Sequence, residues 1–160
     1  MKKLSLLVGA AVLAALLPTA AQAHHSFTMF NPDIENVVEG TVTRWAFNSP
    51  HTFLYITDAD GTLWGFEGAA PPGVITRSPS ITGTTFQPGQ HVIVVHCPLR
   101  DGRNGGGVGI VITDDGTVYN PADAGCGANR RAAQWPDWIA QGFTSRAEAE
   151  AATAATTPAP

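Results

Sequence analysis

The stretch HTFLYITDADGTLWGF, residues 51–66, decides the fold of this chain. Apolar side chains in its first half alternate between two faces, so Leu54 and Ile56 fall on the same side, as they do along a β-strand. The Asp60-Gly61 pair in the middle tolerates the positive φ of a tight hairpin turn. The stretch therefore predicts two antiparallel strands joined by a hairpin, at residues 51–56 and 62–66.

Similar short apolar runs, separated by turn signals, lie on both sides of this hairpin. They predict further strands at residues 40–47, 91–97, 108–112 and 117–119, and one or two helical turns at 74–80. Five main strands with a helical insertion after the third have the element order of an oligonucleotide-binding (OB) barrel. The predicted fold class is therefore all-β, a small five-stranded OB-like barrel with a short C-terminal helical extension. A seven-stranded sandwich is the alternative, but the strand count is low for it.

Three consecutive glycines, Gly105 to Gly107, precede the strand at 108–112. They are not a phosphate-binding loop, because the Gly-Lys-Ser/Thr that completes such a loop is missing. We expect them to form a flexible turn or bulge between strands.

The chain changes character after Tyr119. Residues 121–131 have the composition of a loop, Trp135–Ile139 predicts a short helix packed on the barrel, and Ser145 with Glu148 forms a capping box for an alanine-rich helix. The predicted organisation is a barrel at 24–120, a loop with short helices at 121–151, and a disordered tail at 152–160.

The N-terminus has the pattern of a secretory signal peptide. Two lysines precede an apolar run that ends at Leu17, and Ala21-Gln22-Ala23 follows as a cleavage site. The run is too short for a comfortable membrane span, so we expect residues 1–23 to be removed. The product is then a periplasmic or secreted protein with no membrane span.

Cleavage after Ala23 also removes the chain's only lysines, Lys2 and Lys3. Seven arginines remain against thirteen carboxylates, which gives a formal net charge of −6. A surface of this charge repels nucleic acid, so we expect no nucleic-acid partner.

The chain contains two cysteines, Cys97 and Cys126. Export favours a disulfide between them, which would attach the loop after the barrel to the fourth main strand. The competing interpretation is that Cys97, which follows His96, is a thiolate ligand of copper.

Two adjacent histidines, His24 and His25, follow the predicted cleavage site. An N-terminal His24 offers its α-amine and its ring nitrogen to one metal ion, and both lose protons to a metal near neutral pH. Cleavage one residue earlier makes histidine the third residue, which also suits Cu(II) or Ni(II). Imidazole is a good ligand for copper, zinc and nickel. The terminus therefore predicts a metal site, with copper the first choice.

Further imidazoles must come from within the barrel. His51, at the start of the second strand, and His96, near the end of the fourth, are the candidates. His91 lies on the opposite face from His96 and is ranked last. A structural role is the alternative for each internal histidine.

Six short strings resemble the exported bacterial family known as domain of unknown function 6152 (DUF6152). They are Ala23–Phe30 (AHHSFTMF), Glu39–Val42 (EGTV), Asn48–His51 (NSPH), Trp64–Gly68 (WGFEG), Gln87–Gln90 (QPGQ) and Pro98–Gly102 (PLRDG). The resemblance covers about residues 23–119 and implies a small periplasmic or secreted β protein, without an activity. The family pattern matches His24, His25, His51 and, less directly, His96.

The chain departs from the family pattern in three places. Ser49 is inserted between the Asn and the Pro of the family's Asn-Pro-His string, and Cys97 separates His96 from Pro98. The tail that carries Cys126 is longer than is usual in the family. The two cysteines occur together in these departures, which favours the disulfide over a metal role.

Three functions were weighed. The first is binding of a metal ion for delivery or sequestration, with another periplasmic protein as a possible partner. The second is a metal-free ligand-binding or protein-interaction module of OB-like fold. Catalysis is disfavoured, because the chain is short for an oxidative copper enzyme and has no nucleophile elbow.

Overall fold

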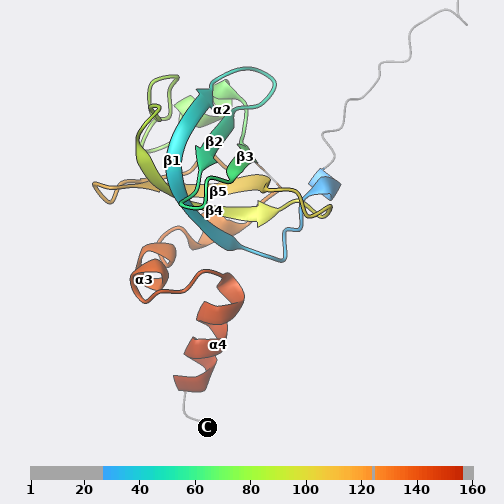
Figure 1. The fold of residues 1–160 in the computed structure, drawn as a ribbon, viewed down its shortest axis with the longest axis vertical. Helices are drawn as coiled ribbons and strands as arrows, with labels where there is room; N and C mark the ends of the chain where they lie inside the picture. The colour runs from blue at the N-terminus through green and yellow to red at the C-terminus, as the bar shows by residue number, and fades with distance from the viewer. Residues whose placement is uncertain (1–26, 124, 157–160) are drawn as a thin grey trace, which may run out of the picture.

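Five strands close into a barrel in the computed structural model, which describes residues 27–123 and 125–156 (Figure 1). The strands are β1 (Asn36–Ala46), β2 (Phe53–Thr57), β3 (Leu63–Glu67), β4 (His91–Pro98) and β5 (Gly105–Thr113). A short β6 (Val118–Tyr119) pairs with β5, and the sheet order is β3-β2-β1-β4-β5-β6. Parallel pairing of β3 with β5 closes the barrel. The predicted OB-like barrel is confirmed.

The predicted hairpin joins β2 to β3. Leu54 and Ile56 are fully buried inside the barrel, whereas Phe53 and Tyr55 are half-buried on its outer face. Gly61 has a φ of +82°, which explains why glycine follows Asp60 in the turn. The hairpin is therefore confirmed, although β2 begins at Phe53, two residues later than predicted.

The prediction of a flexible turn at Gly105 to Gly107 was wrong, because these glycines begin β5 and are buried. They form the parallel pairing with β3, in which Gly106 lies opposite Phe66. A Cβ atom on Gly106 would collide with the carbonyl oxygen of Cys97, and one on Gly105 with that of Gly65. Glycine is required because three strands approach closely where the barrel closes.

Strands β4 and β5 are buried on both their inner and their outer face. Val92 and Val94 point into the barrel interior, whereas Val95 and Cys97 point outwards beneath the C-terminal extension. The outer cluster is completed by Ile110, Ile112, Cys126, Ala128 and Trp135. Two separate cores thus explain why these strands are almost continuously apolar.

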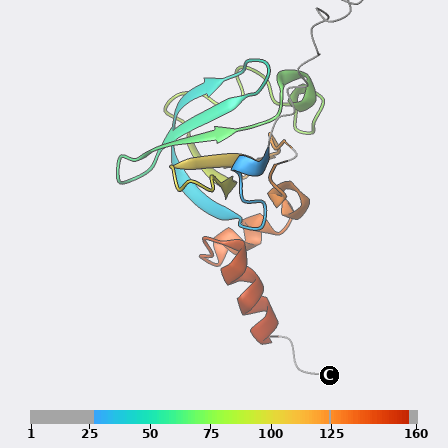
Figure 2. The same ribbon diagram turned by 90° about the vertical axis from the view of Figure 1, so that its right-hand side faces the viewer.

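Short helices connect and extend the barrel (Figures 1 and 2). They are η1 (Phe27–Met29), α2 (Pro71–Ile75), η2 (Ala128–Arg131), α3 (Trp135–Ala140) and α4 (Arg146–Thr156). The insertion α2 begins three residues before the predicted segment 74–80, because prolines occupy its first turn. The predicted helix at 135–139 is confirmed as α3, and α4 continues past residue 151 to Thr156.

Two links hold the extension on the barrel. Cys97 and Cys126 form the predicted disulfide, with Cα atoms 5.4 Å apart, so Cys97 is not available as a copper thiolate. The carboxylate of Glu35 is fully buried and accepts hydrogen bonds from Arg131 (2.6 Å), Arg146 (3.3 Å) and the indole of Trp135 (3.2 Å). Both links lie at the boundary between barrel and extension.

Candidate functional site

His51 lies just before β2, in a polar group at the end of β3. Its Nδ1 atom is 3.1 Å from the carbonyl oxygen of Gly68, 3.4 Å from Oε1 of Glu67 and 3.5 Å from Oδ2 of Asp123. Only 10% of the His51 side chain is exposed, against 21% for Glu67 and 33% for Asp123. One imidazole and two carboxylates therefore meet in a partly buried setting, which we name the His51 group.

The geometry of the His51 group resembles the surroundings of a metal-bound histidine. In its neutral form, His51 donates its Nδ1 hydrogen to the Gly68 carbonyl, which directs metal ligation to Nε2. Carboxylates beside such a ring increase its basicity as a ligand, and they can also bind a metal through oxygen. Glu67 and Asp123 therefore suit either a supporting or a ligating role.

The first described residues of the chain run beside the His51 group. Phe30 packs on Gly107 of β5, and it lines a small depression together with Glu67 and Asp123. Arg100 fixes this segment, because its backbone N–H donates to Met29 O (2.9 Å) and its Nε to Thr28 O (3.1 Å). The chain thus enters the barrel close to His51.

The predicted ligands His24 and His25 lie outside the described residues. Three peptide units connect Phe27, where η1 begins, to His24, and an extended chain of that length spans at most about 10 Å.

His96 has different neighbours from His51. It points into one end of the barrel, 2% exposed, with its ring 5.0 Å from that of Phe66 and 5.8 Å from that of Trp64. Burial lowers its pKa to about 4, so the ring is neutral near pH 7. Its Nδ1 has no hydrogen-bond partner within residues 27–123 and 125–156.

His51 and His96 share none of these neighbours, so no described contact joins them. Among the described residues, no three His, Cys, Asp or Glu side chains are arranged to hold a metal ion. A site at His51 thus needs a ligand from outside the described part of the chain.

His91 is exposed on β4 and binds two carboxylates. Its Nδ1 lies 2.6 Å from Asp114 and its Nε2 lies 2.9 Å from Glu39. The hydrogen bond to Asp114, assisted by Glu39, raises the pKa of His91 and favours an imidazolium ion. An imidazole that is occupied at both nitrogens is a poor metal ligand.

An aromatic groove of about 330 Å³ lies on the outer face of β2 and β3. The rings of Phe53 and Tyr55 stack in it with centroids 6.3 Å apart, and Met29 and Leu63 extend its apolar wall. The guanidinium of Arg44 lies 5.7 Å from the Tyr55 ring centroid. The groove thus presents aromatic side chains on the outer surface of the barrel.

Sequence reasoning identified His51 but missed Asp123. Glu67 was detectable in principle, because the hairpin register pairs it with Phe53, two residues from His51. Asp123 belongs to an irregular segment after β6, and nothing in its local sequence places it beside β3.

The chain was compared with known proteins. Residues 12–108 match the model of one family, described as a family of unknown function (DUF6152). No curated protein and no solved structure gave a match. Among the described residues, no helix has the length and apolar character needed to cross a membrane.

Proposed function

Since this chain belongs to DUF6152, a family whose function is unknown, we propose a function from its own residues: it is an exported protein that binds copper. The observation that carries the proposal is the His51 group. It combines an imidazole fixed at Nδ1, two carboxylates and an adjoining N-terminal segment. Export rests on the signal-peptide pattern of residues 1–23.

In the proposed site, cleavage after Ala23 makes His24 the first residue. Its α-amine and ring nitrogen bind the metal as a chelate, and Nε2 of His51 provides the third nitrogen. His25 is the alternative nitrogen donor. Three nitrogens with a carboxylate oxygen suit Cu(II), and zinc and nickel are the competing ions. His96 is left out of this ligand set because its described contacts are with Trp64 and Phe66.

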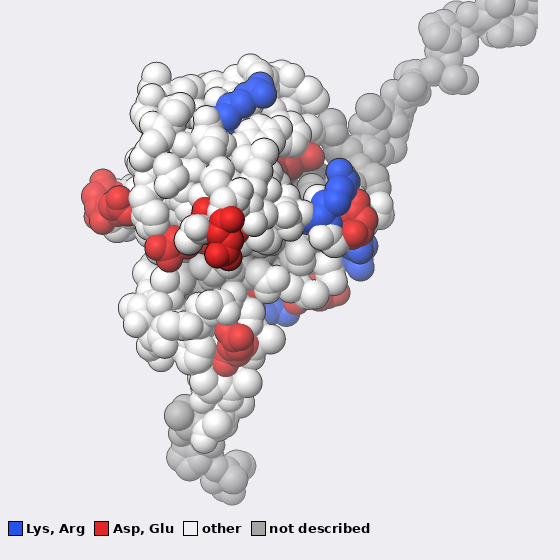
Figure 3. Space-filling model, viewed as in Figure 1, with Lys and Arg blue, Asp and Glu red and all other residues white. Residues whose placement is uncertain are grey.

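The charge of the protein also favours a cationic ligand. Acidic side chains are scattered over the face drawn in Figure 3, and the sequence after residue 23 carries an excess of carboxylates. A negative field concentrates cations near the surface. Such a protein suits delivery or sequestration of copper in the periplasm, with another periplasmic protein as the exchange partner.

The decisive experiment is a copper titration of protein that begins at His24, beside the same protein with its α-amine acetylated. We expect acetylation to weaken Cu(II) binding at least tenfold, because it removes the amine from the chelate without making a histidine the third residue. His51→Ala is expected to weaken binding by a similar factor. His91→Ala is the matched control, since its imidazole lies on β4, outside the proposed site.

Equal copper affinity for the two N-termini would rule out ligation by the terminal amine. Equal copper affinity of the wild type and His51→Ala would rule out His51, and with it the barrel, as a source of copper ligands. Electron paramagnetic resonance of the Cu(II) form should show nitrogen hyperfine structure that changes in His51→Ala.

The aromatic groove supports a second candidate function, which is binding of a polymer such as an oligosaccharide. Stacked rings on the outer face of β2 and β3 are the type of surface that OB-like barrels use for such ligands. If this candidate is correct, metal-free protein should show chemical-shift changes at Phe53 and Tyr55 when soluble oligosaccharides are added. Phe53→Ala should abolish those changes without altering copper affinity.

A further inference from the structure

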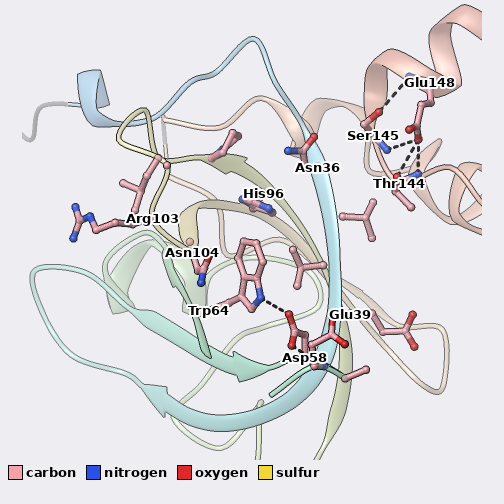
Figure 4. Close-up of a pocket in the computed structure, with 18 residues that line it drawn as sticks. Asn36, Glu39, Asp58, Trp64, His96, Arg103, Asn104, Thr144, Ser145 and Glu148 are labelled. Atoms are coloured by element: carbon pink, nitrogen blue, oxygen red, sulfur yellow. Dashed lines mark hydrogen bonds between the residues drawn. The ribbon is translucent and has the colours of Figure 1, made fainter. Parts of the chain in front are cut away.

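A second cavity, of about 760 Å³, adjoins the aromatic groove and shares Leu99, Arg103 and Asn104 with it (Figure 4). Its walls come from the beginning of β1, the β2–β3 turn, the β4–β5 loop and the residues before α4. A cavity of this volume is in the range of small-molecule sites. We name it the Trp64 pocket.

The Trp64 pocket combines an aromatic surface with an anionic one. Trp64 donates its indole N–H to Oδ2 of Asp58 at 2.8 Å (Figure 4). The hydrogen bond from Trp64 is the main reason why the pKa of Asp58 is lowered, so this carboxylate stays ionised. Trp64 and Asp58 thus present a ring and a fixed negative charge side by side.

The charges around the pocket are strongly unequal. Four carboxylates line it, from Glu39, Asp58, Asp60 and Glu148, and Arg103 is the single cationic lining residue. Glu39 is already paired with His91 at 2.9 Å, so the other three carboxylates provide the excess negative charge. Arg103 is paired with Asp101 at 2.8 Å, which offsets its charge. An anionic ligand would meet net repulsion here, and a cation would be attracted.

The wall of the pocket also contains a buried polar group with an unmet hydrogen bond. The ring of His96 lines the pocket next to Trp64, between Asn36 and Asn104 (Figure 4). Its buried Nδ1 has no partner among the described residues, which is costly for an imidazole nitrogen.

We propose that the Trp64 pocket binds a small organic ammonium compound. The cation lies at the Trp64 ring and beside the Asp58 carboxylate, and the ring of His96 forms part of the pocket wall. The apolar body of the ligand packs on Val38, Pro98 and Leu99, which also line the pocket. A cation at an indole face is stabilised by the ring, and desolvation in a pocket strengthens that contact. This site does not depend on the copper site at His51.

The test uses two probes of the same shape, cyclohexylmethylammonium and cyclohexylmethanol, titrated calorimetrically into protein treated with a chelator. We expect the ammonium to bind at least about tenfold more tightly than the alcohol, because only the ammonium meets the carboxylates and the ring as a cation. Added salt should weaken binding of the ammonium and leave that of the alcohol unchanged.

Variants of the pocket identify the groups responsible. Asp58→Asn is expected to weaken ammonium binding about tenfold and to leave alcohol binding unchanged. Asp60→Asn removes a second carboxylate charge from the pocket and leaves the hydrogen bonds that Asp58 accepts intact. His96→Phe tests whether the imidazole of His96 contributes to ligand binding. Asp137→Asn, on α3 and outside the pocket, is the matched control.

Equal affinities for the two probes would overturn the proposal, as would undetectable binding of the ammonium at millimolar concentration. Unchanged ammonium affinity in both Asp58→Asn and Asp60→Asn would overturn it as well. Weaker ammonium binding in His96→Phe, with a fold that is at least as stable, would support a contribution of the His96 imidazole to the site.

Discussion

At the scale of single residues, three histidines of one barrel illustrate how surroundings change the chemistry of the same side chain. His91 lies exposed between two carboxylates, which raise its pKa. His96 lies among aromatic rings, and burial lowers its pKa to about 4. His51 lies at the end of a strand with a backbone carbonyl and two carboxylates at Nδ1. Only the last of these environments suits an imidazole that binds a metal at Nε2.

The sequence could not separate these three histidines. All lie at or near strand ends, and alternation along β4 separates His91 from His96 only by face. The differences arise from residues far away in the chain, such as Asp114 for His91 and Asp123 for His51. A histidine's partners are therefore a property of the closed barrel and not of its local sequence.

His96 makes the stability of the fold depend on pH. Its folded-state pKa of about 4 is below the value of 6.5 for an exposed histidine, so the unfolded chain binds more protons between these values. The free energy of unfolding should therefore fall as the pH decreases from about 6.5 towards 4. His96→Phe should remove this component and stabilise the protein by about 1 kcal/mol near pH 7, because it eliminates the unpaired nitrogen.

Urea denaturation of the wild type and His96→Phe at pH 7.5 and pH 5 measures both effects. The stability difference between the two proteins should be larger at pH 5. A difference that is the same at both pH values would contradict the assignment of this pH dependence to His96.

At the scale of secondary-structure elements, local patterns predicted most of the barrel. The β2–β3 hairpin followed from alternation and an Asp-Gly turn, and its Gly61 has the positive φ that the turn requires. The disulfide followed from two cysteines in an exported chain. Each of these features depends on few residues, which is why the sequence was sufficient.

Barrel closure was the feature that local patterns did not predict. Gly105 to Gly107 have no side chains to show alternation, so they resembled a loop. Their role appears only in the pairing of β5 with β3, where a side chain on Gly106 would meet the backbone of β4. Glycine in a strand can thus indicate close approach of backbones as well as flexibility.

At the scale of the whole molecule, the barrel carries three distinct surfaces. The His51 group lies at the end of β3, the aromatic groove on the outer face of β2 and β3, and the Trp64 pocket beside the residues that precede α4. The last surface includes Thr144, Ser145 and Glu148, so its shape depends on how the C-terminal extension is attached. None of this arrangement was visible in the sequence, because it joins residues separated by about a hundred positions.

The attachment of the extension depends on Glu35, which supplies the last prediction. Its buried carboxylate accepts hydrogen bonds from Arg131, Arg146 and Trp135 and therefore connects the residue before β1 with η2, α3 and α4. Glu35→Gln removes the charge and directs an amide N–H₂ group towards these donors, which leaves Arg131 and Arg146 with only the exposed carboxylate of Glu150, at 3.8 and 3.6 Å. We expect a loss of about 3 kcal/mol in the free energy of unfolding, as for other broken buried ion pairs, measured by urea denaturation.

The exposed Asp33→Asn is the control and should change the free energy of unfolding by less than about 0.5 kcal/mol. Hydrogen exchange should become faster in α3 and α4 while the interior strands stay protected. If Glu35→Gln is as stable as the control, the buried carboxylate is not what holds the extension on the barrel.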